Sequence, residues 1–67
     1  MASRVQVGQQ FREHGCPYVW EVQAVFERPG EPTHVRLVQV GDHHRLKTIG
    51  IAALLDRQLY DAVTRAE

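Results

Sequence analysis

The sequence has little cysteine, no long apolar run and no excess of charge of one sign. Cys16 is the only cysteine among 67 residues, whereas secreted domains of this size usually need several disulfides. No segment approaches the roughly 20 apolar residues that cross a bilayer. Alternating Val and Gln follow residues 1–4, where a signal peptide would carry an apolar stretch. These absences predict a cytoplasmic protein that has no membrane partner.

The sequence also lacks linkers and catalytic motifs. No Ser/Pro/Gly-rich stretch divides the chain, which predicts a single small domain over residues 1–67. It has no glycine-rich phosphate loop and no nucleophile elbow. A chain this short buries roughly 60% of the surface that its unfolded form exposes, which leaves little room for a preorganised catalytic cavity. We therefore predict a protein that is not an enzyme and that needs no cofactor.

The composition is that of a folded globular protein. Hydrophobic residues make up 43% of the chain and charged residues 24%, which argues against disorder. Eight Lys and Arg balance eight Asp and Glu, so the formal net charge is zero. This balance removes the overall basic field of a protein that binds nucleic acid by charge alone.

Alternation of apolar and polar residues predicts β-strands through the first fifty residues. One side of the first pattern carries Val5, Val7, Gln9 and Phe11. The strongest pattern covers residues 18–27, where the inward positions hold large side chains. These positions are Tyr18, Trp20, Val22, Ala24 and Phe26. We expect this long strand to curve around the core with its rings shielded from water.

Two further strands are predicted between turns that contain Gly or Pro. Residues 28–33 include two prolines and one glycine, which predicts an exposed hairpin tip. In residues 34–40, Val35 and Leu37 lie on one face. A turn at residues 41–44 leads into a fourth short strand at residues 45–49. The first fifty residues therefore predict four antiparallel strands.

The period changes after Ile51. Apolar residues then recur at spacings of three and four, and Ala and Leu are frequent while Pro is absent. This pattern predicts a C-terminal helix. The alternative is one helical turn at residues 52–55 followed by a fifth strand at residues 59–63. The sequence leaves both interpretations of residues 56–67 open.

Several short motifs resemble a known architecture. They are Val7-Gly8-Gln9-Gln10-Phe11, Val19-Trp20-Glu21-Val22, a Pro/Gly tip, His34-Val35-Arg36-Leu37, Lys47-Thr48-Ile49, and Leu54-Leu55-Asp56 with Tyr60. Together they resemble small uncharacterised bacterial proteins that look like SH3-like barrels. The resemblance implies a mainly β fold, a small SH3-like partial barrel of four to five antiparallel strands with a C-terminal helical segment. It implies no activity, because SH3-like barrels bind peptides, RNA, DNA or other subunits.

Positive charge is concentrated on the third and fourth predicted strands. Arg36, Arg45 and Lys47 lie there with only one acidic residue, and three positive charges against one negative charge leave a surplus of two. Protonated histidines would add to it. A phosphate backbone or an acidic protein surface would be attracted to such a patch. The candidate binding residues are Arg36, Arg45, Lys47, His43 and His44.

Four residues of the predicted turns carry possible metal ligands. They are His14, Cys16, His43 and His44. Their nitrogen and sulfur donors suit zinc, but the spacing lacks the paired ligands that structural zinc sites normally show. We therefore interpret them as solvated turn residues and keep a zinc-binding protein as the third hypothesis.

The hypothesis that the sequence favours is a non-enzymatic binding, adaptor or regulatory module that docks on a protein partner. The docking surface would be an exposed strand edge, the Pro29-Gly30 hairpin or the helix, and the basic residues would attract acidic partners. The alternative is an RNA- or DNA-binding module that uses the same basic hairpin. Self-association into a homodimer would cover any surplus apolar surface of the helix.

Overall fold

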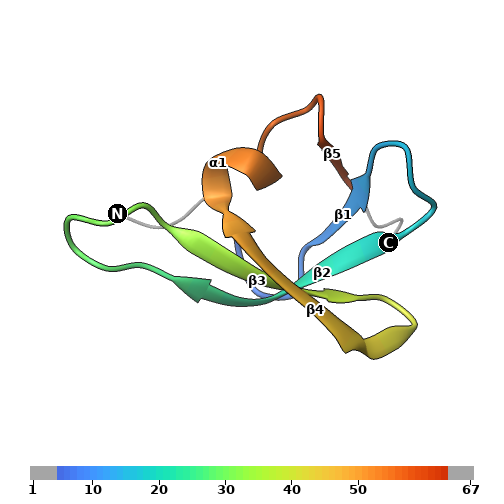
Figure 1. The fold of residues 1–67 in the computed structure, drawn as a ribbon, viewed down its shortest axis with the longest axis horizontal. Helices are drawn as coiled ribbons and strands as arrows, with labels where there is room; N and C mark the ends of the chain where they lie inside the picture. Colours follow the sequence, from blue (N-terminus) through green and yellow to red (C-terminus); the bar gives the residue numbers. More distant parts are fainter. Residues whose placement is uncertain (1–4, 64–67) are drawn as a thin grey trace.

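Five antiparallel strands of the computed structural model form one open sheet (Figure 1). The structure describes residues 5–63. In chain order the elements are β1 (Gln10–Glu13), β2 (Val19–Phe26), β3 (His34–Gln39), β4 (Asp42–Gly50), the short helix α1 (Ile51–Leu54) and β5 (Tyr60–Ala62). The strand order is β4-β3-β2-β1-β5, so β4 and β5 are the two edges of the sheet.

The predicted mainly β fold with four to five antiparallel strands is confirmed. The sheet is open, because within residues 5–63 β4 pairs only with β3 and β5 pairs only with β1. The sheet also curls, so that α1 and β5 lie on the same side of β2 and β3 (Figure 1). Within the described residues, no helix is long and apolar enough to span a membrane.

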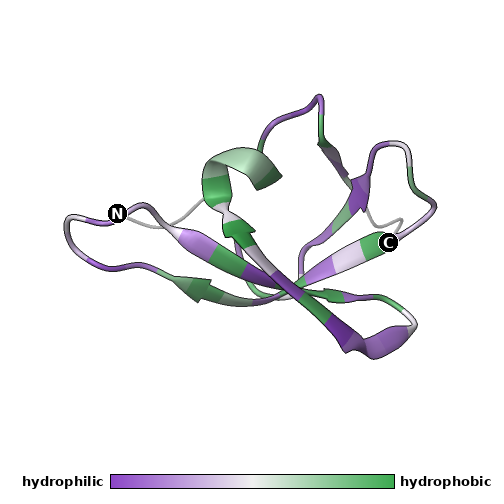
Figure 2. Ribbon diagram, in the orientation of Figure 1, coloured by the Kyte–Doolittle hydropathy of each residue, from purple (hydrophilic) through white to green (hydrophobic). Residues whose placement is uncertain are grey.

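The core lies inside the curl of the sheet. Val35 and Leu37 of β3 are fully buried, and they alternate with the exposed residues His34 and Arg36, as the sequence predicts. Figure 2 shows this alternation of apolar and polar residues along the strands. The described core consists of Val5, Phe11, Trp20, Val22, Val35, Leu37, Leu54 and Tyr60.

A β-bulge divides β2 into two halves. Val22 pairs with Leu37, but Ala24 pairs with Arg36, the next residue of β3 in the antiparallel direction. One extra residue of β2 therefore stands between consecutive partners, and the residues that face inward change from even to odd numbers. In the second half Val25 packs against the core. The period-two pattern of residues 18–27 cannot continue through this bulge.

The structure corrects the prediction that all the rings of residues 18–27 face inward. Trp20 is 7% exposed, so its predicted burial is confirmed. Phe26 follows the bulge and lies on the opposite face, where it is 38% exposed. Tyr18 precedes the strand and is 40% exposed. The prediction is therefore wrong for Tyr18 and Phe26.

The first predicted strand is wrong in its N-terminal half. Val5 and Phe11 are buried, but Val7 is 66% exposed. The reason is a turn over residues 6–9, closed by a backbone hydrogen bond of 3.1 Å. Gly8 has a φ angle of +98° in this turn, a backbone conformation that residues with a Cβ rarely adopt. Only the end of the predicted strand forms β1.

The predicted C-terminal helix is wrong beyond Leu54. The side-chain carboxylate of Asp56 accepts the backbone N–H of Gln58 at 2.9 Å, and the backbone carbonyl of Asp56 accepts the N–H groups of Leu59 and Tyr60. These bonds form a turn, because an aspartate side chain competes with the helix for backbone donors. Residues 64–67, where the helix was also predicted, lie outside the described residues.

The alternative of one helical turn followed by a strand is confirmed. β5 pairs with β1, with Tyr60 opposite Glu13 and Ala62 opposite Phe11. A short isolated helix is marginally stable in water, whereas β5 satisfies the backbone groups of β1 and buries Tyr60. Tertiary pairing therefore outweighs the helical propensity of this segment.

Truncation of the core should destabilise the fold far more than truncation of the outer face. We expect Leu37→Ala to lower the free energy of unfolding by about 2–5 kcal/mol, because Leu37 is fully buried. Leu46→Ala removes the same atoms from a side chain that is 52% exposed, and should change the stability by only about 0.5 kcal/mol. Urea denaturation of both variants measures the difference. Equal losses would contradict this description of the core.

Candidate functional site

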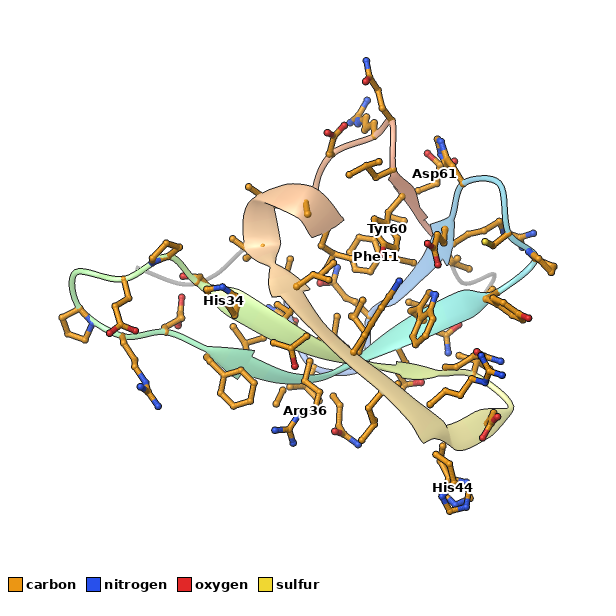
Figure 3. All side chains as sticks on the ribbon, viewed as in Figure 1. Phe11, His34, Arg36, His44, Tyr60 and Asp61 are labelled. Carbon is orange, nitrogen blue, oxygen red and sulfur yellow. The ribbon has the colours of Figure 1, made fainter. Side chains whose placement is uncertain are left out.

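The structure divides the predicted basic patch between the two faces of the sheet. Lys47 pairs with the buried residue Leu37, so both side chains lie on the inner face. Arg36 lies on the outer face and is exposed. Figure 3 shows Arg36 and His44 pointing away from the core, whereas Phe11 and Tyr60 lie inside the curl. The five predicted binding residues therefore do not form one surface.

On the outer face, Arg36 contacts an aromatic ring. Its guanidinium carbon lies 5.3 Å from the centroid of Phe26, a cation–π geometry. The next outer-face pair along the β3–β4 ladder is Val38 and Leu46. Glu21 of β2 pairs with Val38 and therefore lies on the same face. This part of the sheet thus combines apolar side chains with one cation and one carboxylate.

The remaining predicted basic residues lie in a wide bulge at the start of β4. Val38 pairs with Leu46 and Gln39 pairs with Asp42, so His43, His44 and Arg45 have no partner in β3. The two histidine rings lie 4.3 Å apart. The segment is exposed, and its side chains project from the sheet.

Asp42 partly neutralises this bulge. Its Oδ1 accepts the backbone N–H of His44 at 3.2 Å, and its Oδ2 lies 3.5 Å from Nε of Arg45. Solvent-exposed ion pairs of this kind contribute little to stability, but the carboxylate reduces the positive charge of the bulge. The one carboxylate that the sequence sets against these cations therefore lies within the bulge itself.

Lys47 lies in a cluster of residues from four strands. Nζ of Lys47 lies 3.2 Å from Oε1 of Glu13 on β1, and the same oxygen accepts Nε1–H of Trp20 on β2 at 3.0 Å. Nζ also lies 4.3 Å from the ring centroid of Trp20 and 5.2 Å from that of Tyr60 on β5. The ammonium group therefore has one carboxylate and two aromatic rings around it.

These contacts change the ionisation of Lys47. Burial alone would lower the pKa of its ammonium group, but hydrogen bonding and charge attraction from Tyr60 and Glu13 raise the pKa above the ordinary value for lysine. The amine is therefore protonated at neutral pH. A protonated amine is neither a nucleophile nor a general base, so Lys47 contributes a positive charge and N–H donors to this cluster.

The candidate zinc ligands are not brought together. Nε2 of His14 bonds Oδ2 of Asp61 at 2.8 Å, between the β1–β2 loop and β5. Asp61 and His44 lie at opposite ends of the molecule in Figure 3. Cys16 is half-buried in the β1–β2 loop. Within residues 5–63 no group of three or more His, Cys, Asp or Glu side chains could hold a metal ion.

The outer edge of β4 is the longest unpaired strand edge of the described sheet. The N–H of Ile51 donates to the carbonyl of Thr33 at 2.9 Å. Because hydrogen bonds alternate along an antiparallel pair, the backbone groups of Leu46 and Thr48 point away from β3. The side chain of Leu46 is also half-exposed. This edge therefore offers backbone donors and acceptors next to an apolar side chain.

A small groove of about 210 Å³ lies between the two edges of the sheet. Ile49 of β4, Ala53 of α1 and Tyr60 of β5 contribute to its lining. Glu13 also lines it, so the groove adjoins the cluster around Lys47. The open side of the sheet is therefore hollow and largely apolar.

Sequence reasoning missed Glu13, Tyr60 and Asp61 as members of these clusters. Glu13 and Lys47 are 34 residues apart, and His14 and Asp61 are 47 apart. No local pattern reports such contacts, because the first joins β1 to β4 across the curl of the sheet and the second depends on the pairing of β5 with β1. The one available signal was the alternative strand at residues 59–63, which places Tyr60 and Asp61 on opposite faces.

Comparison of the chain with protein-family models, with curated proteins and with solved structures gave no match. The function must therefore be argued from the geometry alone.

The contacts of Lys47 should make the fold sensitive to alkaline pH. The pKa of Lys47 is raised in the folded state, so its stabilising contribution is present below about pH 10.4, the usual lysine value, and is lost as the pH rises through the folded-state pKa. Lys47→Met should remove this dependence. Urea denaturation across the alkaline range measures it.

Comparison of the native chain with Lys47→Met isolates the contribution of Lys47 to the pH dependence. Both contain Tyr18 and Tyr60, so any contribution of the tyrosines is present in both curves. Lys47 is the only lysine of the sequence, and no other amine side chain titrates in this range. Parallel curves for the native chain and Lys47→Met would show that Lys47 has no such contribution.

Proposed function

We propose that this chain is a non-enzymatic protein-binding module that adds an extended segment of its partner to the outer edge of β4. The observation that carries the proposal is the unpaired edge of β4 over residues 46–50, the regular part of this strand that follows its bulge. An unpaired edge is a template for another strand, since its backbone groups form a regular row of donors and acceptors. Main-chain hydrogen bonds would supply affinity, and side chains beside the edge would supply specificity.

The outer face beside this edge supports the proposal. Leu46 is half-exposed, and its cross-strand partner Val38 lies next to it. Natural edge strands usually carry charged or kinked positions that prevent pairing. Here Lys47, the charged residue in the regular part of β4, faces the inner side and contacts Glu13. Residues 46–50 therefore place no charged side chain on the outer face of β4 that would prevent another strand from pairing there.

The charges around the edge of β4 indicate what kind of segment would bind there. Arg36 and the bulge of His43, His44 and Arg45 surround the edge with positive or protonatable groups, against the carboxylates of Asp42 in the bulge and of Glu21 on β2. An extended segment with acidic flanking residues would complement this distribution. A second copy of β4 would bring two sets of these cations together. We therefore propose an acidic partner segment as the occupant, in preference to a homodimer.

We further propose that the domain is an SH3-like partial barrel. Support comes from the order of its elements: a meander of four strands, a single helical turn and a short last strand that returns to β1. The curl of the sheet and the shared core agree with this class. The fold class is compatible with binding and does not specify a ligand.

A nucleic-acid-binding function has less support. Affinity for a phosphate backbone requires several cations that contact it together. Lys47 faces the opposite side and is paired with Glu13, and Arg45 is paired with Asp42. Of the three predicted cations, Arg36 alone remains on the outer face without a carboxylate within ion-pair distance among the described residues.

The edge proposal is tested with Thr48→Pro. Proline removes an N–H that points away from β3, so the β3–β4 ladder keeps its hydrogen bonds while the added strand loses a donor and meets the ring. The probe is a peptide selected on the purified chain from a random library of about ten residues, the upper range of strand lengths. We expect Thr48→Pro to weaken its binding at least about tenfold, measured by calorimetry.

Thr48→Ala is the matched control, because it changes the same side chain and keeps the N–H. It should bind the peptide like the native chain. In NMR spectra, the peptide should shift the amide signals of Leu46 and Thr48 and protect them from exchange. Shifts centred on the Pro29-Gly30 loop, or a chain that dimerises until Thr48→Pro makes it monomeric, would contradict the proposal.

A random-sequence oligonucleotide separates the proposed function from the nucleic-acid alternative. We expect no binding even at about 50 mM salt, where phosphate contacts are strong. The measurement is fluorescence anisotropy of the labelled oligonucleotide. Salt-dependent binding that disappears in the double variant Arg36→Ala, Arg45→Ala would instead favour the nucleic-acid-binding module.

A further inference from the structure

The cluster around Lys47 has the composition of a receptor for a cation. Glu13 supplies a carboxylate oxygen at 3.2 Å from the ammonium nitrogen, and the faces of Trp20 and Tyr60 lie on further sides of it. A carboxylate and the negative faces of aromatic rings attract ammonium ions together. Trp20 and Tyr60 are each only 7% exposed, so their rings are held in place by the core.

The geometry of the receptor does not depend on Lys47 alone. Oε1 of Glu13 is also held by Nε1–H of Trp20 at 3.0 Å. Glu13 and Tyr60 stand opposite each other in the β1–β5 ladder, and Trp20 pairs with Phe11 in the β1–β2 ladder. The three groups are therefore fixed by backbone pairing, whereas Lys47 reaches them with a flexible side chain from β4, across the open side of the sheet.

We propose that Glu13, Trp20 and Tyr60 form a binding site for an alkylammonium group, and that the side chain of Lys47 occupies this site as a ligand supplied by the chain itself. The site is spatially separate from the proposed edge of β4, because Lys47 points to the inner face of the sheet. The groove lined by Ile49, Ala53 and Tyr60 adjoins it, and gives an external alkyl chain a path to the rings. An external ammonium group binds only when the amine of Lys47 leaves or loses its charge.

Competition from Lys47 determines how the native chain behaves. A tethered ligand acts at an effective concentration in the millimolar range or above. An external ammonium ion must exceed this concentration before it occupies the site. Removal of the lysine amine therefore exposes a site that the native chain masks.

The test uses n-butylammonium, which matches the end of a lysine side chain, and n-butanol as its uncharged counterpart. Trp20 is the only tryptophan of the sequence, so its fluorescence reports on the site. We expect n-butylammonium to bind Lys47→Ala with a dissociation constant at least about tenfold below that for the native chain, and to raise the thermal midpoint of the variant. n-Butanol should do neither.

Two further variants identify the site. The double variant Lys47→Ala, Glu13→Gln keeps the rings and the shape but loses the carboxylate charge, and should bind n-butylammonium about tenfold more weakly than Lys47→Ala. Arg36→Ala removes a cation that lies over Phe26 on the other face, and should gain no affinity. Equal effects of n-butylammonium and n-butanol on Lys47→Ala, or equal gains in Arg36→Ala, would overturn the proposal.

A measurement on the native chain keeps the proposal testable if Lys47→Ala does not fold. Because Lys47 is the only lysine, its ε-methylene signals are readily assigned in a carbon–proton NMR spectrum. The aromatic rings should shift these signals upfield from their position in the urea-unfolded chain. Unshifted ε-methylene signals in the folded chain would show that the ammonium group does not occupy the site, and would overturn the proposal.

Discussion

The one-residue bulge in β2 is the constraint on which the arrangement of both faces depends. β2 is the central strand and pairs with β1 on one side and β3 on the other. Before the bulge it turns Trp20 and Val22 inward, and after it Val25 takes the inward position. If the same sequence paired with β3 without a bulge, Phe26 would point into the core and the core would have to expand around its ring. The bulge therefore sets the volume of the core and places Phe26 beside Arg36 outside it.

Because successive side chains of β4 point to opposite faces of the sheet, neighbouring residues of this strand belong to two different surfaces. Leu46 and Thr48 face outward with backbone groups that point away from β3, while Lys47 between them faces inward. The inward position brings Lys47 to Glu13, Trp20 and Tyr60, which belong to three other strands. One strand thus carries an open edge on the outside and, on the inside, the only side chain with an amine.

The sequence predicted the parts of this structure that depend on local pattern. The alternation of Val35 and Leu37, the burial of Trp20 and the exposed tip at Pro29-Gly30 all follow from periodicity or turn chemistry. The bulge carries no such signal, because Gln23 is an ordinary residue at an ordinary position in the pattern. The predicted face of Phe26 was wrong for that reason, whereas Tyr18 was wrong because it lies before the strand begins.

The last segment and the candidate site show a second limit of local reasoning. Residues after Ile51 satisfy a helical period, yet Asp56 ends the helix and β5 pairs with the edge of β1. That pairing brings Tyr60 to Lys47, and the curl of the sheet brings Glu13 and Trp20 to it. The basic residues, by contrast, were recognised from the sequence as a group, but the sequence did not show that the pleat and the carboxylates of Glu13 and Asp42 divide them.

The two surfaces of β4 share one requirement, which is the register between β4 and β3. A shift by one residue would turn Lys47 outward and Leu46 inward, and would remove both the ammonium contact and the apolar side chain beside the edge. The contact of Lys47 with Glu13 opposes such a shift, because it fixes the strand from the inner side. A segment bound at the outer edge would oppose it from the other side. Because each contact orders the same strand, each lowers the conformational entropy that the other must overcome, and by linkage the two should strengthen one another to the same extent.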